Sequence, residues 1–572
     1  MKPWAWSVVP LVALVAACQG HLGSKARPGN PANAGGSSSG GDGSGGSSGT
    51  NPGGGTAGAG MVEVSCTTPN LGSPVLRLLN GREFNATITT LFPPVDAKTW
   101  TNSLPADPVS AYGFDNDSST VVGPQLAQAL LDTATSFATA VTTNALSTML
   151  PCSATSPDRT CADTFIKQYG RRLFRRALTT DEENRYLAFF DADLPKADFK
   201  TVIKWIMVGL IQSPNAVYRS EIGTVANGVR QLSPLEIATE LAYTYTGTTP
   251  TDDLLTKAEG GTLGDYATLA AQLLTPTVMH RFFEAYFQYP QVGAIERDPP
   301  NFDAVRSDMI LETRAFINDI VVTHLGGLKE LLTTNTTNPS PALATYYQND
   351  APNFPAQPAA ADPSTGFFPA VTRPAGLGIG ILAHGSFLAN RALPNSSSPT
   401  QRGLFVFSRL LCETKPNPPA GVPPIGNPEP GVHTTRYRYE MEHANGGTCG
   451  ACHQRFDPIG FGFEHFDEGG RYRQTEDGLT IDTASDVPAP VLTSPPPALF
   501  QFQDEETLAQ GLAAQPLVYQ CFAAYLAIYA FGSGESCIGE SKVADFQSGN
   551  VGIAQYFVDL AGEPHFSQRS SQ

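Results

Sequence analysis

The pentapeptide Cys449-Gly450-Ala451-Cys452-His453 constrains the fold and chemistry of this chain more than any other segment. Two thiols at this spacing reach one edge of a porphyrin and form thioethers with its vinyl groups, while the adjacent imidazole ligates the iron. The pattern predicts one covalent haem c attached to Cys449 and Cys452, with His453 as the proximal ligand of the haem iron. A Cys449–Cys452 disulfide and a site for another metal are the alternatives for the same spacing.

Three nearby residues are candidates for the opposite side of the haem iron: Met441, His443 and His465. A methionine would raise the reduction potential, a second histidine would lower it, and an open face would allow chemistry with peroxide or oxygen. We favour His443, because a helix from Tyr437 to Asn445 would return its side chain over the ring.

The loop after the pentapeptide carries acidic and basic side chains that can pair with one another. We expect Asp457, Glu464 and Asp467 to fix this loop by hydrogen bonds or by pairing with Arg471 and Arg473. A role in orienting the haem ligand or in proton delivery stays open.

The first residues predict export. Lys2 precedes a short apolar run, Val8–Ala17, which is too short to span a bilayer and is typical of a signal peptide. The run ends in Val15-Ala16-Ala17-Cys18, which resembles a bacterial lipobox, so Cys18 is the expected lipidated first residue of the mature protein. Residues 19–60 are rich in Gly and Ser and should form a flexible tether. We therefore expect an outer-membrane or cell-surface lipoprotein, with an ordinary signal peptide as the alternative.

The charge of the chain excludes some partners. A net charge of −17 and a pI near 5.0 argue against nucleic acid and against electrostatic binding to an anionic membrane surface. The expected contact with the membrane is the lipid anchor alone. A single haem offers no internal path for long-range electron transfer, so we expect an external redox partner, such as another cytochrome. The sequence does not identify an extracellular substrate.

The remaining cysteines are even in number, as expected for an exported chain whose thiols oxidise. Many pairings are possible in principle. We expect the cysteines that are close in sequence to pair and the other two to pair by elimination: Cys152–Cys161, Cys521–Cys537 and Cys66–Cys412.

Most of the chain after the tether predicts helix. Apolar residues recur at helical spacing over Phe199–Ile211. Thr180–Glu183 and Ser233–Glu236 are typical of helix starts with a capping box. Strand-like alternation is scarce, with a short piece near Leu479–Asp482. The predicted fold class is mainly α: a multi-module helical protein with a cytochrome-c-like segment and few short strands.

Pro- and Asn-rich breaks suggest where the modules end. The predicted division is a lipoprotein signal at 1–18, the tether at 19–60, helical modules at 61–150, 151–225 and 226–360, a cytochrome-like module with the pentapeptide at 370–480, and a C-terminal helical module at 498–572.

Several segments carry a recognisable pattern, in order along the chain: Leu76–Thr87, Gly113–Asn116, Phe174–Leu178, Gln212–Arg219, Leu232–Ala238, Pro250–Leu255, Arg373–Leu382, Arg402-Gly403 and Cys449–Arg473. They resemble the planctomycete-type secreted domains, a multi-module family of unknown function. The resemblance implies an exported, cytochrome-like protein whose relatives often adjoin cytochrome c domains, and it supplies no reaction. We therefore expect a surface lipoprotein with a c-type haem that acts in electron transfer or haem-dependent oxidation; the alternative is a non-catalytic surface-binding or assembly protein.

Overall fold

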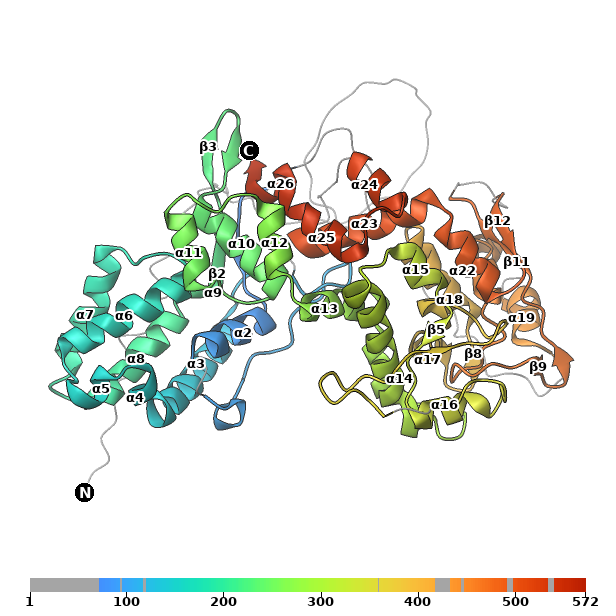
Figure 1. Ribbon diagram of the computed structural model, residues 1–572, viewed down its shortest axis with the longest axis horizontal. Helices are drawn as coiled ribbons and strands as arrows, with labels where there is room; N and C mark the ends of the chain where they lie inside the picture. The colour runs from blue at the N-terminus through green and yellow to red at the C-terminus, as the bar shows by residue number, and fades with distance from the viewer. Residues whose placement is uncertain are drawn as a thin grey trace, which may run out of the picture. The chain divides into compact units, whose positions relative to one another are not determined.

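The computed structural model describes residues 71–571, apart from 93–94, 117–119, 358–359, 417–432, 444–446, 491–496 and 533–539. These residues belong to one compact unit, Gly58–Gln572. The fold is mainly α, with short strands in small antiparallel sheets (Figure 1), which confirms the predicted class. The signal peptide, Cys18 and the tether lie outside the described residues.

The first half of the described chain is a succession of helices. Helices α3, α6, α7 and α8 pack side by side (Figure 1). In chain order the helices are α2 (Gly81–Leu91), η2 (Ala97–Thr99), α3 (Pro124–Asn144), α4 (Leu146–Met149), α5 (Cys152–Thr155), α6 (Arg159–Phe174), α7 (Thr180–Asp193), α8 (Phe199–Ile211), α9 (Pro214–Val217), α10 (Pro234–Thr246), α11 (Asp252–Glu259), α12 (Tyr266–Leu273) and α13 (Pro276–Phe287).

The second half has shorter helices and several tight or wide helical turns. In chain order these are η3 (Tyr289–Ala294), α14 (Phe302–Ile317), η4 (Asn318–Thr323), α15 (Leu328–Thr333), α16 (Pro341–Gln348), η5 (Ile381–Ala383), α17 (Gly385–Asn390), α18 (Pro399–Phe405), η6 (Val406–Leu410), α19 (Thr435–Tyr437), η7 (Arg438–His443), α20 (Gly447–His453), α21 (Asp457–Phe461), α22 (Glu505–Ala513), α23 (Pro516–Phe531), α24 (Glu540–Gln547), α25 (Ile553–Asp559), η8 (Leu560–Gly562) and α26 (Pro564–Ser567).

Two of the small sheets join segments that are far apart in the sequence. β1 (Val75–Leu78) pairs with β2 (Tyr218–Glu221), and β4 (Val229–Gln231) lies between β3 (Thr224–Ala226) and β13 (Gln568–Ser570). The remaining pairs are local or join neighbouring loops: β5 (Thr336–Thr337) with β6 (Val371–Thr372), β7 (Ala392–Leu393) with β8 (Ser396–Ser397), β9 (Thr475–Glu476) with β10 (Leu479–Thr480), and β11 (Ser485–Pro488) with β12 (Ala498–Phe502).

Local sequence signals explain where several helices begin. Ser233 caps α10 and forms the expected capping box with Glu236, and the apolar stripe of α8 is buried. The capping box of α7 uses Thr179 with Glu182, so this helix begins one residue before the expected cap. The predicted helices and caps are therefore confirmed here to within one residue.

Helix α23 is apolar on all sides because it is enclosed by the core. Its side chains pack with those of α13 and η6, so segments from distant parts of the sequence share one hydrophobic cluster. Among the described residues, no single helix is long and apolar enough to cross a membrane. Helices α22 and α23 pass that test only as a pair, and they are bent by 75°.

The disulfides confirm one expected pair and correct the others. Cys152 and Cys161 are bonded, as predicted. Cys521 is bonded to Cys412, with Cα atoms 5.5 Å apart, so the expected pairs Cys521–Cys537 and Cys66–Cys412 were wrong. The reason is tertiary: α23 packs against η6, which ends just before Cys412, and this contact outweighs closeness in sequence. Cys66 and Cys537 lie outside the described residues.

Candidate functional site

Helix α20 carries the pentapeptide and places Cys449 and Cys452 one helical turn apart on the backbone. Cys452 has a free thiol and is partly buried against the main hydrophobic cluster. The side chains of Cys449 and His443 lie outside the described residues. Helix α20 therefore presents a thiol and an imidazole at its C-terminal end, beside a hydrophobic core.

His453 is held by a buried carboxylate. Its Nδ1 lies 2.9 Å from Oδ2 of Asp457, whose side chain is only 4 % exposed. The hydroxyl of Thr400 donates to the other oxygen, Oδ1, at 2.6 Å, and lies 3.4 Å from His453 Nδ1. Because a carboxylate oxygen can only accept, Nδ1 is the donor in this contact. A carboxylate that accepts from Nδ1 is the usual partner behind a histidine that ligates a metal through Nε2.

Helices α18 and α21 bring Thr400 and Asp457 together by a very close approach. A Cβ added at Gly403 would lie 1.9 Å from the carbonyl oxygen of Phe456, and one added at Gly460 would lie 2.0 Å from that of Pro399. Only glycine fits at either contact, because a methyl group needs more than 3 Å. These two glycines therefore set the distance between the hydroxyl and the carboxylate.

The loop after the pentapeptide is tied to α18 by a fully buried arginine. Arg402 donates to the carbonyl oxygens of Phe463 at 2.9 Å, Phe466 at 2.7 Å and Asp467 at 2.7 Å. Burial lowers the pKa of Arg402 to about 10, which leaves its guanidinium charged at neutral pH. The arginine thus satisfies carbonyl groups that burial would otherwise leave without donors.

The expected pairings of this loop are confirmed. Asp467 accepts from Arg471 at 2.9 Å, and Glu464 lies 3.5 Å from Arg473. Asp457 pairs with His453 rather than with either arginine.

The three distal candidates differ in their surroundings. Met441 is 50 % exposed on η7, a π-helical turn in the place where an α-helix from Tyr437 to Asn445 was expected. His465 donates from Nδ1 to the carbonyl of Arg473 at 2.8 Å and stacks on Tyr472. The choice among Met441, His443 and His465 stays a prediction.

A second site, which the sequence did not reveal, is a buried network of charged side chains near β1 and β2. Glu221 accepts from Arg77 and from Arg569, each with a closest contact of 2.5 Å. Arg77 also donates to the carbonyl of Phe531, at the end of α23. Burial alone would raise the pKa of Glu221, but Arg77 and Arg569 hold it well below its usual range. The network therefore joins β1, β2 and β13 through the Glu221 carboxylate, and the end of α23 through Arg77.

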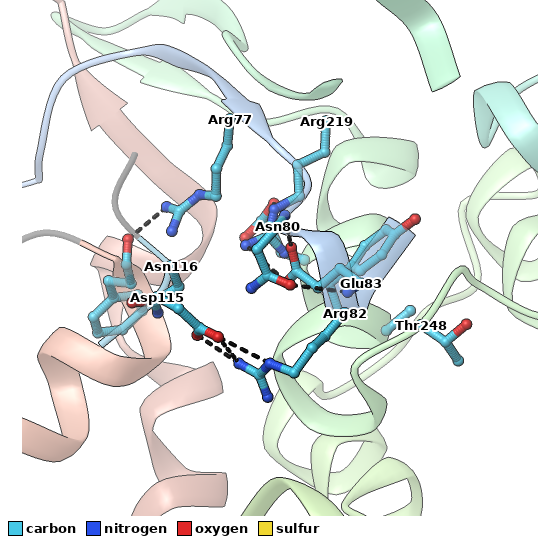
Figure 2. A network of polar contacts seen from close by, with 12 residues as sticks. Arg77, Asn80, Arg82, Glu83, Asp115, Asn116, Arg219 and Thr248 are labelled. Carbon is cyan, nitrogen blue, oxygen red and sulfur yellow. Dashed lines mark hydrogen bonds and ion pairs between the residues drawn. The ribbon is translucent and has the colours of Figure 1, made fainter. Parts of the chain in front are cut away.

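More charged side chains continue this network (Figure 2). Arg219 lies 3.8 Å from Glu83 and 3.7 Å from Glu240, and burial raises the pKa of the Glu240 carboxyl. Arg82 pairs with Asp115 (Figure 2). Buried arginines in an apolar strand such as Leu76-Arg77-Leu78 are a signal that sequence analysis can use, because they require partners.

A third cluster surrounds the buried Arg373. Its guanidinium donates to the carbonyl of Ala383 at 2.9 Å and lies 3.8 Å from the buried Glu312. Glu505 accepts from the backbone N–H of Ile379 at 2.8 Å. Burial raises the pKa of Glu505 to about 8 from a usual value of 4.5, against the lowering effect of that hydrogen bond and of Arg373.

This raised pKa predicts a pH dependence of stability. Between about pH 4.5 and about pH 8, folding takes up a proton at Glu505, because the carboxyl has a higher pKa in the folded chain. Protonation of Glu505 therefore adds to the unfolding free energy in full below about pH 4.5, and this contribution is lost as the pH rises through about 8. We expect Glu505→Gln to remove that part of the decline in unfolding free energy, as measured by urea unfolding at about pH 5 and about pH 9. Glu296→Gln, at an exposed position, is the control. An unchanged pH dependence in Glu505→Gln would contradict the assignment.

Four protein-family models match the chain, in order along the sequence. They are PSD3, Protein of unknown function (DUF1587), at residues 77–143; PSD5 (DUF1595) at 161–221; PSD4 (DUF1592) at 232–348; and PSCyt3 (DUF1588) at 379–476. The chain carries four domains of this planctomycete-type set. Their function is unknown. No curated protein and no solved structure matches the chain.

The domain matches give the two sites different positions. Cys449, Cys452, His453 and Asp457 all fall within DUF1588. The charged network instead crosses domains, with Arg77 in DUF1587, Glu221 in DUF1595 and Glu240 in DUF1592. A network shared by three domains serves to join them, whereas the site in DUF1588 is local and carries groups that can bind a metal.

Proposed function

We propose that the protein is an exported surface lipoprotein that binds one haem c through Cys449, Cys452 and His453 and acts in electron transfer or haem-dependent oxidation. The observation that carries the proposal is the free thiol of Cys452 on the same helix as His453. A c-type haem supplies one-electron redox chemistry when it is bound.

The state of the cysteines favours haem over the alternative. Cys152 and Cys412 are in disulfides, whereas Cys452 is not. The alternative function is a non-catalytic surface-binding or assembly protein in which Cys449 and Cys452 form a disulfide or bind another metal; the free thiol of Cys452 argues against the disulfide only. A thioether to haem would use this thiol.

The surroundings of His453 also fit a haem ligand. The carboxylate of Asp457 fixes the ring and its tautomer, as groups behind metal-bound imidazoles do. Tyr437 and Met441 expose apolar surface just before α20 in the chain, 42 % and 50 % of each residue, and a porphyrin could cover such surface. The name of the matching family, PSCyt3, supports a relation to cytochromes.

The proposed location and partner rest on the sequence. Cys18 in the lipobox-like segment, followed by the tether, supports a lipid anchor in the outer membrane. We favour a haem oxidoreductase that exchanges electrons with another cytochrome over a lone carrier, because the chain surrounds one site with several helical domains. Binding of carbon monoxide or cyanide would support enzyme chemistry, and a spectrum unmoved by either would favour the carrier.

The decisive experiment is a haem stain after denaturing electrophoresis of the protein expressed in a periplasm with haem-attachment machinery. We expect a stained band for wild type and for Cys152→Ala, a weaker one for Cys449→Ala, which keeps the Cys452 thiol, and none for the double variant Cys449→Ala/Cys452→Ala, because only thioether-bound haem survives unfolding. Cys152→Ala is the matched control, since it removes a cysteine from a disulfide. A wild-type band without stain would leave the binding or assembly function as the better reading.

A further inference from the structure

We propose that Asp457, held by Thr400, is a positioning residue that makes His453 a more basic ligand and lowers the reduction potential of the haem. This inference rests on the proposed function and goes beyond it, because it assigns a direction to the redox chemistry of the site. Asp457 would touch neither the haem nor a substrate, and would act through His453.

Each oxygen of the Asp457 carboxylate accepts a different hydrogen bond. Oδ2 accepts from His453 Nδ1 at 2.9 Å, and Oδ1 accepts from the Thr400 hydroxyl at 2.6 Å. The side chain cannot turn away from the ring without losing one bond, and α18 and α21 are too closely packed at Gly403 and Gly460 to let it shift. The carboxylate is therefore fixed against Nδ1.

Among the described residues, no arginine or lysine forms an ion pair with Asp457. Within the described part of the chain, the ion pair of Asp457 is the one with His453. The nearest arginine in sequence, Arg455, pairs with Glu413 at 2.9 Å and lies over the ring of Phe407. A buried carboxylate without a cationic partner exerts its full field on the imidazole.

This field has a defined effect on a haem. A carboxylate bonded to Nδ1 draws the Nδ1 proton toward itself, which raises the basicity of Nε2. A more basic ligand and a nearby negative charge both stabilise ferric iron over ferrous iron. The haem would therefore give up its electron readily and suit an electron donor.

The test is a potentiometric titration of the purified holoprotein and of Asp457→Asn. Asparagine keeps the shape and an acceptor oxygen but removes the charge. We expect the potential of Asp457→Asn to rise, so that the ratio of reduced to oxidised haem at a fixed applied potential increases about tenfold. Thr400→Val removes a donor but leaves the charge, so its potential is not expected to rise.

Asp467→Asn is the matched control, because Asp467 is also buried in this domain but accepts from Arg471 and Gly469 rather than from His453. A merely structural role would lower the stability of both variants without moving the potential. Haem bound to Asp457→Asn at the wild-type potential would overturn this inference alone. Absence of haem from wild type would overturn the proposed function, and this inference with it.

A second measurement covers the case in which Asp457→Asn does not fold. In reduced wild-type protein, we expect the Nδ1 proton of His453 to resonate far downfield in the NMR spectrum, as a proton shared with a carboxylate does. Thr400→Val should keep that resonance. An Nδ1 proton at an ordinary position would overturn the inference.

Discussion

Replacing Glu221 by glutamine is expected to lower the unfolding free energy by about 3–5 kcal/mol. Glu221 is fully buried and is shared by Arg77 and Arg569, which are also buried. Glutamine would leave the two guanidinium groups in the core without their common counter-charge. Removing one member of a buried charged network costs far more than removing an exposed ion pair.

Urea unfolding followed by circular dichroism measures this effect, and Asp191→Asn provides the control. Asp191 pairs with Arg159 at 3.1 Å, but both side chains are at least half exposed, so we expect a change within about 1 kcal/mol. Similar transition midpoints for the two variants would show that the buried network does not hold the domains together.

Gly460→Ala is expected to destabilise the protein by about 3 kcal/mol and to impair haem attachment. The added methyl group would lie 2.0 Å from the carbonyl oxygen of Pro399, a distance that only a shift of α18 or α21 can relieve. Such a shift would separate Thr400 from Asp457 and loosen the carboxylate that holds His453.

Gly562→Ala is the control for Gly460→Ala, since no atom lies within 4 Å of a Cβ added at Gly562. Thermal unfolding and the ratio of haem absorbance to protein absorbance are the two measurements. Wild-type values of both in Gly460→Ala would contradict the close contact between α18 and α21.

Features set by neighbouring residues could be predicted from the sequence. The caps of α7 and α10 and the apolar stripe of α8 each depend on a few consecutive residues, and each was expected to within one residue. The Cys152–Cys161 disulfide closes a short loop and was also expected.

Features that depend on contacts between distant residues could not be predicted from the sequence. The Cys412–Cys521 bond depends on how α23 packs against η6, which no local pattern encodes. The network around Glu221 joins β1, β2, α23 and β13, which are far apart in the sequence. Arg77 was therefore recognised in the sequence only as part of a family motif.

The candidate site lies between these two cases. The spacing of Cys449, Cys452 and His453 is local and predicts a haem ligand set directly. Asp457 is only four residues from His453, but a turn separates α20 from α21, so helical spacing alone does not predict their contact. Thr400 is far away in the sequence, and only the contact of α18 with α21 brings it to the carboxylate.

The link between Glu221 and Arg569 also bears on how this protein folds. The two residues are 348 positions apart, and Arg569 lies on β13, which pairs with β4. Contacts of such high sequence separation close large loops and slow folding. Until residues 568–570 are in place, Glu221 and the end of α23 lack part of their environment, so partly folded chains would remain exposed to proteases and chaperones for longer than a domain of local helices would.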